Sequence, residues 1–149
     1  MRIISHRGNL NGRIPSRENS PSYIDEAISH GYEVEVDVWY LDGRFYLGHD
    51  EPQYEISEEW LSSRPSLWCH AKNFDALNQM MTRSIHCFWH ETDRITITSK
   101  GLIWCYPNTY NRNGITVDLN PEATKIPTDC MGVCTDIPEE WKLLQTNSQ

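Results

Sequence analysis

The sequence is poor in basic residues and has neither a long apolar run nor an export-like leader. Only 13 Lys and Arg residues stand against 21 Asp and Glu residues, which gives a formal net charge of −8. A negative surface repels nucleic-acid backbones, so we expect no nucleic-acid partner. No run of about 18 apolar residues predicts a membrane span, and the apolar run in MRIISHRG is too short for a signal peptide. The sequence therefore favours a cytoplasmic protein without stable membrane insertion.

Cysteine is present in an odd number, five, and no pattern indicates a disulfide framework. Without an export signal, we expect Cys69, Cys87, Cys105, Cys130 and Cys134 to be reduced and buried. Only Cys130 and Cys134 lie close together in the sequence. No second pair completes a zinc ribbon, so a metal site at these two cysteines is not favoured.

No internal repeat, low-complexity segment or linker divides the chain, which predicts one domain over residues 1–149. A chain of this length buries roughly 68–70% of the surface of its unfolded state, enough for a sizeable core. The polar residues from about 143 to 149 are expected to fray. Short strand-like segments alternate with helical ones, and this order is typical of an α/β fold with a parallel sheet or barrel.

Local signals place several of the elements. The segment PSYIDEAISHG, residues 21–31, predicts a helix with Ser20 as its N-cap and Gly31 at its end. The Asp42-Gly43 pair predicts a hairpin between two strand-like runs. A second hairpin is expected around Lys100-Gly101.

The strand VEVDV, residues 34–38, carries two acids on one face. Period two places Glu35 and Asp37 together and the three valines on the opposite face, toward the helices. Carboxylates about 7 Å apart along a strand repel one another unless a cation lies between them, and a divalent ion with oxygen ligands would explain the pair. The alternative is an acidic strand face in water, which Glu33 would continue.

Histidines follow two of the predicted strands. His6 and Arg7 end the first strand, and His49 ends the hairpin that follows the acidic strand. Active sites of parallel β/α barrels form where strands end, so these side chains are expected near the two acids. Two histidines beside a metal can share proton transfer, one as base and one as acid. The other histidines that we considered are interpreted as structural: His30, His86 and His90.

Five short motifs in order resemble the glycerophosphodiester phosphodiesterase family. They are HRG at 6–8, REN at 17–19, EVDV at 35–38, DG at 42–43 and HD at 49–50. The two histidines and the E-x-D pair are also similar to those of the venom phospholipases D. Arg17 stands where the family has a proline. The similarity is strong over residues 1–50 and thinner beyond them, where LWCHAKN, LIWCYPN and GVCTDIPEEW resemble later strands of the family.

The resemblance implies a role for ten residues. His6 and His49 would be the catalytic acid and base; Glu35, Asp37 and His70 would hold the metal; Arg7, Lys72 and Trp104 would contact the substrate; and Glu18 and Asn19 would support them. Two alternatives stay open. Trp104 could be only a core residue, and Arg7 with Glu18 could be a buried structural pair.

The third metal ligand departs from the family. His70 occupies the position of an acid in the family's third strand, and period two places it on the same face as Lys72. We expect one divalent metal ion, with Mg²⁺ or Ca²⁺ favoured by the two carboxylates. Mn²⁺ and Zn²⁺ also remain, because they accept imidazole well.

The fold implied by the resemblance is a TIM (β/α) barrel of the PLC-like phosphodiesterase type. Such barrels typically need about 250 residues, whereas this chain has 149. We therefore expect a reduced barrel in which several helices are trimmed or replaced by hairpins. Uncovered strand edges in such a barrel would favour a homo-oligomer.

The activity implied is that of a hydrolase in lipid metabolism, a metal-dependent phosphodiesterase that acts on a small glycerophosphodiester-like substrate. Two alternatives stay open. One is a lyase that releases a cyclic phosphate, similar to the venom enzymes. The other is a barrel that binds a phosphorylated ligand or a partner without turnover. The sequence does not identify the alcohol on the diester.

Overall fold

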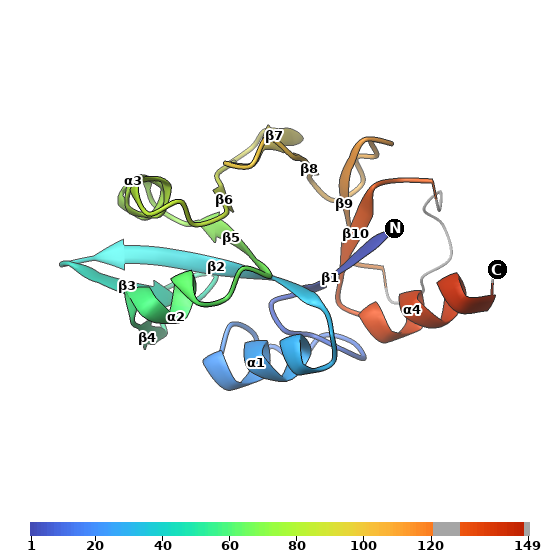
Figure 1. Cartoon of the computed structure of the whole chain (residues 1–149), viewed down its shortest axis with the longest axis horizontal. Helices are drawn as coiled ribbons and strands as arrows, with labels where there is room; N and C mark the ends of the chain where they lie inside the picture. The colour runs from blue at the N-terminus through green and yellow to red at the C-terminus, as the bar shows by residue number, and fades with distance from the viewer. Residues whose placement is uncertain (121–128, 148–149) are drawn as a thin grey trace.

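The computed structural model describes residues 1–120 and 129–147 as a curled mixed sheet with a few helices (Figure 1). The strands are β1 (Arg2–His6), β2 (Glu33–Leu41), β3 (Arg44–Leu47), β4 (Tyr54–Ile56), β5 (Leu67–Ala71), β6 (Cys87–Phe88), β7 (Ile95–Ile97), β8 (Ile103–Cys105), β9 (Gly114–Asp118) and β10 (Gly132–Thr135). The helices are α1 (Pro21–Ser29), α2 (Glu58–Ser62), α3 (Phe74–Thr82) and α4 (Pro138–Asn147).

The parallel strands follow one another in the order β6-β5-β2-β1-β10-β9-β8. Antiparallel partners extend this series: β3 pairs with β2, β4 with β3, and β7 with β8. Figure 1 shows the strands curving around a common centre. The backbone N–H of Ser99, just after β7, donates to the carbonyl of Cys87 in β6 at 2.7 Å, which joins the two ends of the curl. This α/β arrangement is compatible with the expected reduced barrel.

Both predicted hairpins are confirmed, as is the first predicted helix. The turn at Asp42-Gly43 joins β2 and β3, and the turn containing Gly101 joins β7 and β8. Ser20 caps α1 by accepting a hydrogen bond from the backbone N–H of Tyr23. The expected fraying from about residue 143 stays a prediction; α4 continues to Asn147. The acids of its first turn favour the helix through its dipole.

The helices cover one side of the curl. Helix α1 packs on β2, α3 packs on β2, β5 and β6, and α4 packs on β1. Figure 1 shows α1 and α4 outside the strands near β1 and α3 outside β5 and β6. Since the parallel strands run in the same direction, their C-terminal ends meet at one end of the curl, where the functional residues were expected.

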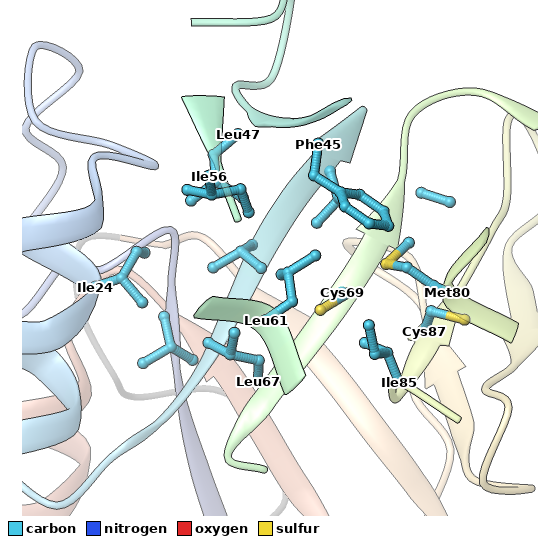
Figure 2. Packing of buried hydrophobic residues seen from close by; sticks show 14 of the residues in the cluster. Ile24, Phe45, Leu47, Ile56, Leu61, Leu67, Cys69, Met80, Ile85 and Cys87 are labelled. Atoms are coloured by element: carbon cyan, nitrogen blue, oxygen red, sulfur yellow. The ribbon is translucent and has the colours of Figure 1, made fainter. Parts of the chain in front are cut away.

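Two apolar clusters lie on opposite faces of the curled sheet, one on its outside and one on its inside. The outer cluster contains the three predicted valines, Val34, Val36 and Val38, each fully buried, together with side chains of the helices. Figure 2 shows part of this cluster, with Ile24 from α1, Leu61 from α2 and Met80 from α3 converging on the strands. The inner cluster is formed by Ile4, Trp68, Phe88, Trp104, Ile115, Val117 and Cys134.

All five cysteines are buried and free, as expected. Among the described residues, no helix has the length and apolar character that crossing a bilayer requires.

Candidate functional site

The two strand acids lie inside the curl. Glu35 is 3% exposed and Asp37 is fully buried, so the interpretation of a solvated strand face is wrong for both. The register of the parallel strands aligns Glu35 with His6 of β1 and Asp37 with His70 of β5. Glu33 does not join these residues, because its carboxylate accepts a 2.7 Å hydrogen bond from the indole N–H of Trp68.

A three-residue group is arranged so that it could hold a metal ion. One ligand atom each from Glu35, Asp37 and His70 lies within 4.8 Å of the others. Nδ1 of His70 is 3.5 Å from Oδ1 of Asp37 and 3.8 Å from Oε1 of Glu35. Oε2 of Glu35 and Oδ1 of Asp37 are buried without a hydrogen bond. Buried polar atoms rarely lack a partner, so these orphaned oxygens fit a divalent cation.

The surroundings shift the pKa values of the two carboxyl groups in opposite directions. Burial would raise the pKa of Asp37, but contacts with His70, Arg7 and Asn19 hold it well below its usual value. Burial and repulsion from Asp37 raise the pKa of Glu35 above its usual value. A cation bound between them would favour the ionised form of both.

Asp37 is fixed through one of its oxygens. Oδ2 lies 3.0 Å from Nε of Arg7 and accepts a 2.9 Å hydrogen bond from Nδ2 of Asn19. Oδ1 of Asn19 accepts a 3.0 Å hydrogen bond from the backbone N–H of Asp37. Nζ of Lys72 is 3.9 Å from Oδ1, on the orphaned side. The carboxylate is therefore oriented with Oδ1 free for a further ligand.

His6 is held by an acid that the sequence interpretation missed. Its Nδ1 lies 2.7 Å from Oδ1 of Asp136, which also accepts a hydrogen bond from Asn9. Burial would lower the pKa of His6, but the hydrogen bond to Asp136 and the charge of Glu35 raise it above its usual value. Asp136 directly follows the last strand in the motif TDIP, and this position was the signal that could have found it.

Glu18 forms the buried pair with Arg7 that was one of the open alternatives. Oε2 of Glu18 lies 3.3 Å from Nη1 of Arg7, and Oε1 accepts hydrogen bonds from Asn9 and Arg13. Arg7 and Asn19 adopt left-handed backbone angles, with φ of 55° and 62°. The backbone N–H of Asn19 donates to the Arg7 carbonyl at 3.1 Å. This network fixes the two residues that orient Asp37.

His49 reaches the site from the loop after β3. Gly48 has φ of 150°, and a Cβ there would overlap the carbonyl oxygen of Glu51. The backbone N–H of Gly48 donates to the carbonyl of Asp37 at 3.1 Å, and this hydrogen bond links the loop to β2. Nδ1 of His49 lies 2.7 Å from Oδ1 of Asp50, and the side chain is 42% exposed. His49 is thus the more accessible of the two predicted catalytic histidines.

One cavity of about 300 Å³ brings most of the predicted residues together: His6, Arg7, Glu35, His49, His70, Lys72 and Trp104. Glu18 and Asn19 line a neighbouring cavity, and Asp37, a member of the metal group, is fully buried and lines neither cavity. Trp104 is 3% exposed and stacks on Phe88, so it is a core residue that also lines the cavity. The sequence interpretation missed the rest of the aromatic wall, which includes Trp89, His90 and Tyr106.

Comparisons with protein-family models, with curated proteins and with solved structures give no match for this chain. The site combines a group of two buried carboxylates and an imidazole with three further histidines and two basic side chains around one cavity.

Proposed function

We propose that this chain is a metal-dependent phosphodiesterase that cleaves a small glycerophosphodiester-like substrate in a reduced barrel of the PLC-like phosphodiesterase type. The observation that carries the proposal is the pair of orphaned oxygens in the metal group. Oδ1 of Asp37 lies 3.5 Å from Nδ1 of His70, and Oε2 of Glu35 lies 3.8 Å from Nε2 of His6. The motif resemblance over residues 1–50 supports the same reaction.

The cavity offers charge where a phosphodiester would need it. A divalent cation held by Glu35, Asp37 and His70 would, when bound, supply Lewis-acid polarisation of the phosphate. Arg7 and Lys72 line the same cavity and carry positive charge for the phosphate oxygens. Because Glu18 and Asp37 hold the Arg7 guanidinium, that charge is oriented before substrate binds.

The two histidines provide proton transfer. Asp136 accepts a hydrogen bond at Nδ1 of His6, which leaves Nε2 of His6 on the side of Glu35 and the cavity. His49 presents a half-exposed ring to the same cavity. One of the two accepts a proton from the attacking hydroxyl or water, and the other donates a proton to the leaving alcohol.

Substitution of each histidine tests the proposal. With bis(p-nitrophenyl) phosphate and a glycerophosphodiester panel, we expect His6→Ala and His49→Ala to lower kcat by about 10²–10⁴-fold. His30→Ala is the matched control, since His30 pairs with Glu139 on the surface and should leave kcat unchanged. Unchanged turnover in both site variants would contradict the mechanism.

Product identity separates hydrolysis from the lyase alternative. Phosphorus NMR of the reaction mixture distinguishes a phosphomonoester from a cyclic phosphodiester. We expect the monoester to accumulate as the final product. A stable cyclic product would assign the chain to lyase chemistry, and binding of the diester without any product would leave the non-catalytic alternative.

A further inference from the structure

The proposed metal site presents few oxygen donors. Arg7 and Asn19 already occupy Oδ2 of Asp37, so this carboxylate offers only Oδ1. Glu35 offers its two oxygens, and the remaining donor is Nδ1 of His70. Three carboxylate oxygens at most fall well short of the six to eight oxygen ligands that Ca²⁺ usually takes. Water would have to supply the rest.

The nitrogen donor is held in place before a metal arrives. The His70 ring stacks on Phe88 with centroids 4.9 Å apart and an interplanar angle of 14°. It also stacks on His90, with a separation of 4.7 Å and an angle of 12°. These contacts with neighbouring side chains restrict the ring plane, and in this orientation Nδ1 lies toward both carboxylates.

The local charge also disfavours ions that bind mainly by electrostatics. The two carboxylates carry at most two negative charges, and Arg7 and Lys72 lie 3.0 Å and 3.9 Å from the oxygens of Asp37. Mg²⁺ and Ca²⁺ depend on charged and neutral oxygen ligands. Mn²⁺, Co²⁺ and Zn²⁺ gain additional binding energy from an imidazole nitrogen.

We propose that this site selects a first-row transition ion, Mn²⁺, Co²⁺ or Zn²⁺, over Mg²⁺ and Ca²⁺, and that His70 determines this selectivity. The inference rests on the metal site of the proposed function and narrows the ion that it takes. His90 is a positioning residue for the His70 ring.

Metal titration of the chelator-stripped protein tests the selectivity without measuring turnover. By calorimetry and by the shift in Tm, we expect Mn²⁺ to bind at least about 10-fold more tightly than Mg²⁺ or Ca²⁺. His70→Asp should reduce or reverse this ratio, because it replaces the nitrogen by oxygen. His30→Ala controls for adventitious binding to surface histidines and should leave the ratio unchanged.

Two further measurements keep the test independent of how well His70→Asp folds. Electron spin echo spectra of the Mn²⁺-loaded wild-type protein should show coupling to a directly bound imidazole nitrogen. His90→Phe should retain the stack and the metal affinity, whereas His90→Ala should weaken Mn²⁺ binding. Equal affinity for Mn²⁺ and Mg²⁺, or the absence of nitrogen coupling, would overturn the inference.

The outcomes for the ion and for the enzyme are separable. Selective Mn²⁺ binding without diester cleavage would support the ion selectivity and contradict the proposed function. Diester cleavage at equal rates with Mg²⁺ and Mn²⁺, together with equal affinities for the two ions, would support the proposed function and contradict the ion selectivity. Binding of no ion at all would contradict both.

Discussion

Asp136 holds the His6 ring by a 2.7 Å contact at Nδ1. A carboxylate partner favours the imidazolium form, whereas a neutral amide does so much less. We therefore expect Asp136→Asn to lower the pKa of His6, which is raised in the wild-type protein. The titration is followed by NMR of metal-free protein, because a bound cation would itself shift the pKa. An unchanged His6 midpoint would show that Asp136 does not tune the ring, and Glu139→Gln serves as a surface control.

Asn19 combines a left-handed backbone with two hydrogen bonds to Asp37. Asn19→Gly and Asn19→Ala both remove these hydrogen bonds, but only glycine accepts φ of 62° without steric cost. We expect the alanine variant to be less stable than the glycine variant by about 1 kcal/mol in urea unfolding. Equal stabilities would mean that the left-handed conformation carries no cost at this position.

At the scale of single residues, the sequence predicted the positions of side chains that directly follow strands within the first 50 residues. Their positions follow from short-range rules, because a residue directly after a strand lies at one end of the sheet. Asp136, Asn9 and His90 were missed as site residues, since their roles depend on partners far away in the chain. Asp136 directly follows β10, which places it at the same end of the sheet, but its pairing with His6 spans 130 positions and no local pattern encodes the pair itself.

At the scale of secondary-structure elements, Asn73 links helix α3 to strand β2. Its Oδ1 caps the helix by accepting from the backbone N–H of Ala76 at 3.0 Å, and its Nδ2 donates to the carbonyl of Tyr40 at 2.9 Å. Asn73→Ala removes both the cap and the link between elements. We expect a loss of about 2–3 kcal/mol in the free energy of unfolding.

Ser57→Ala provides the matched comparison for Asn73. Ser57 caps the five-residue helix α2 through a hydrogen bond from the backbone N–H of Trp60, and the contact is exposed. Loss of this cap alone should cost about 0.5–1 kcal/mol. Equal losses in the two variants would show that the link from Asn73 to β2 adds nothing.

Elements were predictable where turn and cap chemistry are local. The Asp42-Gly43 turn and the Ser20 cap each act within a few residues, and both elements form as expected. The end of α4 was not predictable in the same way. Trp141 of α4 is 1% exposed and packs with Val133 and Ile137, so tertiary contacts stabilise a helix with a polar end.

At the scale of the whole molecule, the burial of one histidine in its neutral form, His86, makes the stability of the fold depend on pH. Burial, aided by the charges of Lys100 and Arg2, lowers the pKa of His86 to about 4. Above about pH 6.5 the ring is neutral in both the folded and the unfolded chain, so it has no effect on stability. Between about pH 6.5 and 4 only the unfolded chain takes up the proton, and stability falls.

His86→Gln should make this acid dependence shallower by on the order of 2–3 kcal/mol between those limits. Glutamine has polar atoms that can serve the partner of His86, the hydroxyl of Thr98. Unfolding free energies from urea titrations across pH 4–7 measure the difference, with His30→Gln as the exposed control. Parallel curves for wild type and His86→Gln would contradict the assignment.

The whole-molecule architecture was predictable only in its coarse form. Alternating strands and helices indicate an α/β sheet, and the shortness of the chain indicates that helices are missing. The curl itself, and the link from Ser99 to Cys87 that joins its two ends, arise from long-range strand pairing. That pairing places Glu35, Asp37 and His70 around one point, which the sequence alone could only suggest.

The central claim, metal-dependent phosphodiester cleavage at this point, is tested most directly by one measurement. The initial rate of diester cleavage is followed while Mn²⁺ is added to chelator-stripped wild-type protein and to Asp37→Asn, an isosteric variant whose fold is checked by circular dichroism. We predict saturable activation of the wild type and a rate at least about 100-fold lower for Asp37→Asn. Cleavage that ignores the metal, or that proceeds equally in Asp37→Asn, would contradict the account.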